Sequence, residues 1–159
     1  MKIIQVLGCS AICAAFLASA SPVAAQVPAA GPQVWVAQVK VSRGIVRIER
    51  GGQRFPAPVG ARLKVEAAVI TEGNGSVGLM FADNSTLSMG PGGEVLLQGY
   101  SYDPTTYMGA FDAYVKQGTV SLQAGNLAQG APDSMKITTP QAVVKGNARQ
   151  FLVNVEEKK

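Results

Sequence analysis

The segment Val41-x-x-Gly44-x-Val46-x-Ile48-x-x-Gly51 decides the fold, because its pattern returns as Val115-x-x-Gly118-x-Val120-x-Leu122-x-x-Gly125. In each copy a glycine precedes two apolar residues that are two positions apart, and a second glycine closes the unit. Side chains two positions apart lie on the same face of a β-strand, so each copy predicts a strand with one buried face. The repetition predicts a domain built from two similar β units.

Outward from these two units, short apolar segments recur between turns rich in Gly, Pro, Asn and Asp. None of them shows the 3.6-residue period of an amphipathic helix, and their lengths are typical of strands. We therefore predict an all-β domain. The expected strands cover residues 34–41, 45–49, 63–65, 68–71, 76–82, 86–89, 95–98, 111–115, 119–123, 135–138, 142–144 and 151–155.

The hairpin expected between residues 76–82 and 86–89 has a register that follows from its apolar pattern. A three-residue connection centred on Asn84 places Phe81 beside Leu87 and Leu79 beside Met89. This register keeps the apolar side chains on one face, as a half-buried hairpin requires. Asn84 is the residue of the connection that best tolerates a left-handed backbone conformation.

Residues 1–25 have the pattern of a signal peptide, which would form a helix. Lys2 precedes an apolar stretch that ends in small residues, and we expect cleavage between Ala25 and Gln26. Two alternatives stay open: an uncleaved anchor, because the stretch approaches the ~20 residues that span a bilayer, and lipidation of Cys9. Cleavage would place the mature protein in the periplasm or outside a bacterial cell, in contact with the membrane only before the signal segment is removed.

The mature chain then has three parts. Residues 26–33 are rich in Pro, Ala and Gly and form a flexible lead-in, residues 34–155 form the β domain, and residues 156–159 form a charged tail. The chain contains no histidine, and both cysteines, Cys9 and Cys13, lie in the signal segment. These counts exclude Ser-His-Asp chemistry, a thiolate nucleophile and Cys/His metal sites from the β domain. We expect no enzyme activity, no cofactor and no metal.

Charge is distributed unevenly along the chain, whose net charge is +4. Bases gather between residues 40 and 64, whereas residues 66–157 are mainly acidic. The functional interpretation is a docking face for an acidic partner, and the alternative is an ordinary solvated strand face. Nucleic acid is not expected, because the chain is exported and its basic stretch lacks a repeated alternation of aromatic and basic residues. The candidate partner-binding residues are Lys40, Arg43, Arg47, Arg50, Arg54, Arg62 and Lys64.

Two groups of aromatic residues have alternative interpretations. Trp35, between two valines, is expected to fill the core rather than to bind a ligand. Tyr100, Tyr102 and Tyr107 flank a turn at Asp103, where they form either an aromatic surface for a sugar or partner, or a loop with incidental tyrosines. The second interpretation is preferred for the tyrosines.

Several stretches occur in an order that resembles the FecR domain family. They are Gly44-Ile-Val-Arg-Ile, Val59-Gly-Ala-Arg-Leu63, Ala68-Val-Ile-Thr71, Gly75-Ser-Val-Gly-Leu-Met-Phe-Ala-Asp83-Asn-Ser85, Gly118-Thr-Val and Ile137-Thr-Thr-Pro-Gln-Ala-Val-Val-Lys-Gly146. The chain departs from the family where Asn84 replaces the glycine of an Asp-Gly-Ser corner, and where Lys145-Gly146-Asn147 replaces Arg-Gly-Thr. The resemblance implies a solenoid-like or flattened two-sheet β roll in the periplasm and supplies no catalytic residues.

Regulatory members of this family relay signals from outer-membrane receptors. We expect this chain to be a stand-alone form, without their cytoplasmic sigma-binding segment and membrane helix. The function expected on this basis is a non-enzymatic periplasmic sensory or regulatory adaptor whose partner is another envelope protein. The alternative is an envelope structural protein, or one that binds glycan or cell wall.

Overall fold

Strands dominate the protein, which confirms the expected all-β class. The computed structural model describes residues 35–146 and 148–156. The signal segment 1–25, the lead-in 26–33 and residues 157–159 of the tail lie outside the described residues. Within the described part, no helix is both long enough and apolar enough to span a membrane.

The described residues form one sheet of 12 strands. A single turn of helix, α1 (Leu127–Gly130), and a 3₁₀ turn at Pro132–Ser134 interrupt the strands. The strands are β1 (Ala37–Arg43), β2 (Val46–Arg50), β3 (Gln53–Pro56), β4 (Arg62–Leu63), β5 (Ala68–Thr71), β6 (Ser76–Phe81), β7 (Thr86–Met89), β8 (Glu94–Tyr102), β9 (Gly109–Gln123), β10 (Met135–Thr138), β11 (Val143–Lys145) and β12 (Gln150–Val155).

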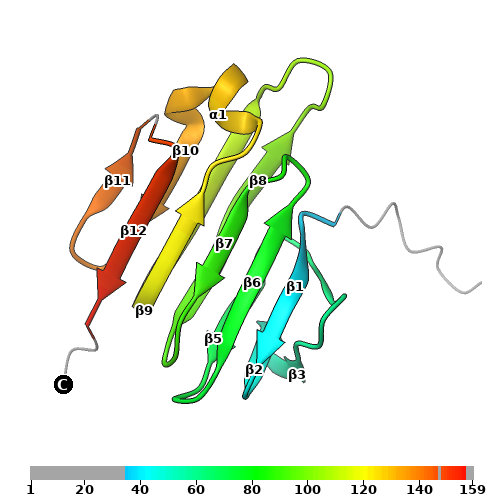
Figure 1. The fold of residues 1–159 in the computed structure, drawn as a ribbon, viewed down its shortest axis with the longest axis vertical. Helices are drawn as coiled ribbons and strands as arrows, with labels where there is room; N and C mark the ends of the chain where they lie inside the picture. Colours follow the sequence, from blue (N-terminus) through cyan, green and yellow to red (C-terminus); the bar gives the residue numbers. More distant parts are fainter. Residues whose placement is uncertain (1–34, 147, 157–159) are drawn as a thin grey trace, which may run out of the picture. The chain divides into compact units, whose positions relative to one another are not determined.

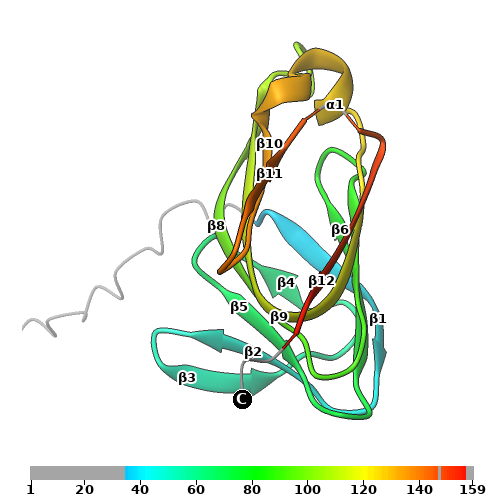
Figure 2. The same cartoon turned by 90° about the vertical axis from the view of Figure 1, so that its left-hand side faces the viewer.

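The sheet curls over on itself into two halves that share β9. The front half contains β1, β4, β6, β7, β12 and the C-terminal part of β9, and Figure 1 shows β12, β9, β7, β6 and β1 side by side. The back half contains β2, β3, β5, β8, β10, β11 and the N-terminal part of β9. Figure 2 shows the two halves from the side. All pairs are antiparallel except β9 with β10.

The two glycines that open the repeated pattern lie where the chain passes between the halves. Gly44 connects β1 of the front half to β2 of the back half, and Gly118 is the point where β9 leaves β8 and joins β7 and β12. Their φ angles are +64° and +91°, a region that glycine adopts without steric cost. A Cβ atom at Gly118 would lie 2.5 Å from the Cα of Gly93, and one at Gly44 would overlap the carbonyl of Asn74.

Each of these glycines therefore packs against another segment that crosses between the halves. Asn74 lies in the turn from β5 to β6, and Gly93 lies in the turn from β7 to β8. The buried hydroxyl of Thr71 ties the turns together, because it donates to the carbonyl of Gly90 at 2.6 Å and accepts from the N–H of Gly93 at 2.8 Å. We call the region where the chain crosses between the two halves, at Gly44 and Gly118, the crease of the sheet. Close backbone contact holds the crease together and leaves no room for a side chain at either glycine.

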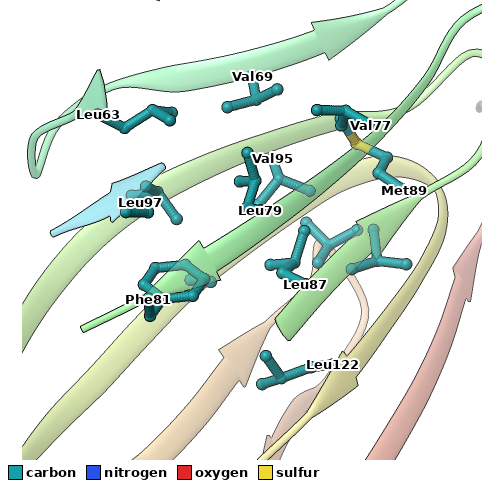
Figure 3. Close-up of a cluster of buried hydrophobic side chains, with 14 of the residues drawn as sticks. Leu63, Val69, Val77, Leu79, Phe81, Leu87, Met89, Val95, Leu97 and Leu122 are labelled. Atoms are coloured by element: carbon teal, nitrogen blue, oxygen red, sulfur yellow. The ribbon is translucent and has the colours of Figure 1, made fainter. Parts of the chain in front are cut away.

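The core lies between the two halves and is built from the inward positions of both. In Figure 3, Val77, Leu79 and Phe81 of β6 lie near side chains from the back half such as Val95 and Leu97. The predicted burial of the repeated apolar pairs is confirmed for three members and partial for the fourth. Val46, Val120 and Leu122 are buried, while Ile48 is partly buried against the core.

The predicted register of the β6–β7 hairpin is wrong by two residues. Leu79 pairs with Leu87 rather than with Met89, which instead lies opposite Val77. The apolar face is the expected one, because a shift of two residues preserves the alternation. Asn84 has the expected left-handed conformation, with a φ of +65°. The connection forms one residue earlier than predicted, and it contains Asp83, whose side chain is completely buried.

Candidate functional site

The two faces of the β2–β3 hairpin divide the predicted basic residues. Ile48 pairs with Phe55 and Arg50 pairs with Gln53, so these four side chains share one face. Arg47, Glu49 and Arg54 alternate with them and lie on the other face. The stretch of bases that is continuous in sequence is therefore not one surface in space.

On the outward face of this hairpin the basic residues are paired with acids. Arg47 lies 3.0 Å from the carboxylate of Glu72, and Arg54 lies 2.6 Å from that of Glu49. The hydrogen bond that Arg54 donates to the Glu49 carboxylate raises the pKa of the Arg54 guanidinium above its ordinary value. Both pairs are exposed, and such pairs contribute little to stability. They do neutralise two of the predicted docking residues.

The opposite face of the hairpin borders a hollow, which we call the seam hollow, between β2, β3 and β4. Its volume is ≈ 230 Å³. Ile48, Leu63 and Ala67 supply aliphatic lining, and Phe55 stands beside them with 44% of its surface exposed. Cationic side chains complete the lining: Arg50, Arg62 and Lys64.

A second hollow of ≈ 230 Å³, the outer hollow, adjoins the first along β1 and β6. Trp35 and Arg62 line both hollows, and Lys40 and Met80 line the outer one. Trp35 is 38% exposed, so the expectation that it fills the core is wrong. The Lys64 ammonium lies 5.1 Å from the centre of its ring, within the range of a cation–π interaction. We call this combined surface the Trp35 groove, with polar and aromatic lining from Trp35, Lys40, Arg50, Phe55, Arg62 and Lys64.

The structure brings four of the seven predicted docking residues together. Lys40, Arg50, Arg62 and Lys64 line the Trp35 groove, and among the described residues none of them has an acidic group within ion-pair distance. Arg47 and Arg54 lie on the outward face of the hairpin in their ion pairs. Arg43 is exposed at the end of β1 and lines neither hollow.

Sequence reasoning missed Phe55 and misplaced Trp35. The stretch Gln53–Pro56 shows no apolar alternation, because all four of its residues are exposed. The sequence did contain one indication that Phe55 is an exposed contact residue: it is an aromatic residue that lies between two turn segments and next to a base. Trp35 lacked such a signal, because valines flank it on both sides.

A second polar cluster closes the end of the domain away from the crease. Asp83 is completely buried, and its carboxylate accepts hydrogen bonds from the Ser85 N–H, the Ser85 hydroxyl, the Tyr100 hydroxyl and the Leu127 N–H. The Ser85 hydroxyl oxygen accepts from the N–H of Gly125 at 2.9 Å. This Asp83 cluster joins the β6–β7 turn of the front half to β8 of the back half and to the segment after β9.

Aromatic packing supports the same connection. The ring centres of Phe81 and Tyr100 are 5.3 Å apart, and those of Phe81 and Phe111 are 5.0 Å apart in an edge-to-face arrangement. Tyr102 also packs against the core, while Tyr107 is exposed. The tyrosines therefore do not form a joint aromatic surface, and the preferred interpretation of incidental loop tyrosines is also wrong, because Tyr100 and Tyr102 belong to β8 and pack against the core. The Asp83 cluster is a structural element, which we call the Asp83 lock, because the donors around the carboxylate come from Ser85, Tyr100 and Leu127 of three different parts of the fold.

The Tyr100 phenol makes this lock sensitive to alkaline pH. Burial, and then the negative charge of Asp83, raise the pKa of Tyr100 above its ordinary value of 10.0. The folded state therefore binds the phenolic proton more tightly than the unfolded state. This tighter binding adds to the free energy of unfolding in full below pH 10.0, the ordinary pKa of the phenol, and the added stability is lost as the pH rises from there through the raised pKa of the folded state. We expect the free energy of unfolding to fall more steeply between about pH 9 and about pH 11 in the wild type than in Tyr100→Phe. Urea unfolding at both pH values measures this, and equal slopes would contradict the assignment.

Comparison with known proteins leaves the fold and the groove as the basis for function. No family model, no curated protein and no solved structure matches this chain. The resemblance to the FecR domain rests on the stretches quoted from the sequence.

Proposed function

We propose that this chain is an exported, non-enzymatic FecR-like binding domain that acts as a periplasmic sensory or regulatory adaptor. Its partner in this proposal is another envelope protein, which presents an acidic surface to the Trp35 groove. The signal-peptide pattern of residues 1–25 supports export, and the FecR-like stretches support the adaptor role. The same stretches, and the matching positions of Gly44 and Gly118 at the crease, support a β roll built from two similar units.

The observation that carries the proposal is a concentration of cations, unpaired among the described residues, beside exposed aromatic rings. Arg50, Arg62 and Lys64 line the seam hollow, and the exposed rings of Trp35 and Phe55 lie among them. Arginine and large aromatic residues are enriched where proteins bind proteins. Cations that have no acidic neighbour also steer an acidic partner during association.

The chemistry of the described residues supports binding rather than catalysis. The most deeply buried carboxylate, Asp83, already accepts hydrogen bonds from three residues of the fold. It therefore has no open position at which a substrate proton would be exchanged. Among the described residues, the groove itself is lined by cations, the amide of Gln38, aliphatic side chains and aromatic rings, without a pair of acids.

A second candidate function is an envelope structural or glycan-binding protein. The observation that favours it is the exposure of Trp35 and Phe55, because exposed aromatic rings also stack on sugar rings. Under this alternative, binding depends on the rings and responds little to salt. Under the adaptor proposal, binding depends on the bases and weakens as salt screens them.

Charge reversal in the groove tests the adaptor proposal. We expect the triple variant Arg50→Glu, Arg62→Glu, Lys64→Glu to lose salt-sensitive capture of its envelope partner, because the potential of the groove changes sign. The matched control is Arg43→Glu with Lys145→Glu, two exposed bases that line neither hollow. Both variants should unfold within about 0.5 kcal/mol per exchange of the wild type. Capture from envelope extracts at low and high salt measures the effect, and full capture by the triple variant would contradict it.

A further inference from the structure

The Trp35 groove lies at the opening of the curled sheet. Along the strand order, β3 forms one end and β4 the other, and each pairs with a single neighbour, β2 or β1. The seam hollow is lined from both ends, by Phe55 of β3 and by Arg62 and Leu63 of β4. Among the described strands, the unpaired edges of β3 and β4 thus both border a shared, partly apolar hollow, whereas β11 and β12 are edge strands elsewhere in the sheet.

The two free edges offer different hydrogen-bonding groups. The carbonyls of Ala61 and Leu63 accept from β1, so the peptide groups of Arg62 between them point away from β1, toward the open side. On β3, Pro56 has no N–H to offer to another strand. A peptide ligand can therefore form backbone hydrogen bonds with the free peptide groups of β4. At β3, the missing N–H of Pro56 blocks the addition of an extended strand.

The lining of the seam hollow defines the chemistry of its ligand. The side chains of Ile48, Leu63 and Ala67 offer only aliphatic carbon, and within the described part of the chain no amide or carboxylate side chain lines this hollow. The cations of this hollow can donate to sugar hydroxyl oxygens, but no lining side chain accepts from a sugar O–H, at a cost of about 1–3 kcal/mol for each buried donor left unsatisfied. An apolar side chain has no such requirement. The cations that line the same hollow are Arg50, Arg62 and Lys64.

The size of the hollow limits the anchor to one side chain. Its volume of ≈ 230 Å³ lies below the ~300–1,000 Å³ of pockets that enclose a drug-sized ligand. One large aliphatic or aromatic side chain suits a hollow of this size and lining. Carboxylates on either side of that anchor would reach Arg62 and Lys64, which flank Leu63 in sequence. Charged hydrogen bonds of this kind are about twice as strong as neutral ones.

We propose that the Trp35 groove binds an acidic peptide segment of a partner protein, with one large apolar side chain in the seam hollow and flanking carboxylates on Arg62 and Lys64. This inference rests on the proposed adaptor function and names the part of the partner that the domain recognises. The apolar lining favours this occupant over an acidic glycan. Among the described residues, no acidic side chain pairs with the cations of the groove, and this favours an acidic peptide over an uncharged one.

The chain carries its own reporter for this proposal, since Trp35 is its single tryptophan. The probe is a synthetic peptide with one leucine between acidic residues, titrated into the full-length chain while Trp35 fluorescence is recorded. We expect a saturable change in emission. Exchange of the leucine for alanine, or of the acidic residues for their amides, should each weaken binding about tenfold, because each removes one of the two contacts. Arg62→Gln with Lys64→Gln should have the same effect, whereas the control Lys145→Gln should bind like the wild type.

Several outcomes would overturn the proposal. They are the absence of any fluorescence change or calorimetric heat with the peptide, equal binding of the amide peptide, and a stronger response to a uronic-acid oligosaccharide than to the peptide. The adaptor function is judged separately, by capture of the envelope partner. If capture stays sensitive to reversal of the groove charges while the peptide fails to bind, the peptide proposal falls and the adaptor proposal stands. If capture itself is absent or insensitive to those charges, the adaptor proposal falls.

Discussion

Replacement of Asp83 by alanine is expected to lower the free energy of unfolding by about 3–5 kcal/mol. The carboxylate is completely buried and accepts from Ser85, Tyr100 and Leu127. Its removal leaves these donors buried without partners, and each orphaned group costs about 1–3 kcal/mol. It also disconnects the β6–β7 turn from β8, so the two halves of the sheet lose their link at this end. Equilibrium unfolding in urea measures the change.

Two matched variants make the Asp83 result specific. Asp83→Asn keeps one oxygen acceptor and loses the other, so its stability should lie between those of the wild type and Asp83→Ala. Asp133→Ala removes an exposed acid and should change the free energy of unfolding by no more than about 0.5 kcal/mol. If Asp83→Ala unfolds within about 1 kcal/mol of the wild type, the carboxylate does not lock the fold as described.

The second large effect is expected at the crease, where Gly118→Ala should cost about 2–4 kcal/mol. The φ angle of Gly118 is +91°, and a Cβ atom there would lie 2.5 Å from the Cα of Gly93. The Cβ position is fixed by the backbone of residue 118 and the Cα of Gly93 is itself a backbone atom, so neither can rotate away, and the crossing between the halves must open. Gly44→Ala meets the carbonyl of Asn74 and should behave in the same way. Thermal unfolding measures both variants.

Gly90 supplies the control for these two variants. It lies in the same turn region as Gly93, but a Cβ atom on Gly90 would meet only the carbonyl oxygen of Thr119, at an ordinary distance of 3.8 Å. Gly90→Ala should therefore retain nearly the full stability of the wild type. Equal destabilisation by Gly90→Ala and Gly118→Ala would show that loss of any glycine, rather than the close contact at the crease, is responsible.

The alternation of apolar residues predicted most of the strands, because that alternation reflects burial of one face. The bounds of β5, β7 and β10 are the predicted ones. β3 was missed, since its residues are all exposed and carry no apolar pattern. β9 was predicted as two strands because Gly118 looks like a break, whereas the structure uses this glycine to bend a continuous strand from one half to the other.

The hairpin register and α1 depended on a tertiary contact that local sequence does not reveal. The carboxylate of Asp83 bonds to Tyr100 and Leu127, which lie far along the chain, and these bonds set where the β6–β7 turn forms. α1 itself spans only four residues, which is too short for a helical period to appear in the sequence.

The candidate site was predictable in its charge but not in its geometry. The excess of bases between residues 40 and 64 identified the region. Local sequence could not show that Glu72, outside that region, neutralises Arg47, nor that the hairpin sends Arg54 to the opposite face from Arg50. Trp35 lies just before β1, and β1 pairs with β4, so Trp35 comes to line the groove together with residues of β4. This pairing joins segments that are separated in the sequence.

Site-specific photocrosslinking in the intact envelope tests the central claim, binding through the Trp35 groove, most directly. A photoreactive amino acid replaces Phe55 in one protein and, as a control, Leu152 of β12 in another, since Leu152 is 73% exposed and lines neither hollow. The account predicts a discrete protein adduct at position 55 that disappears with Arg62→Glu and Lys64→Glu, and no such adduct at position 152. No adduct at position 55, or equal adducts at both positions regardless of the groove charges, would contradict it.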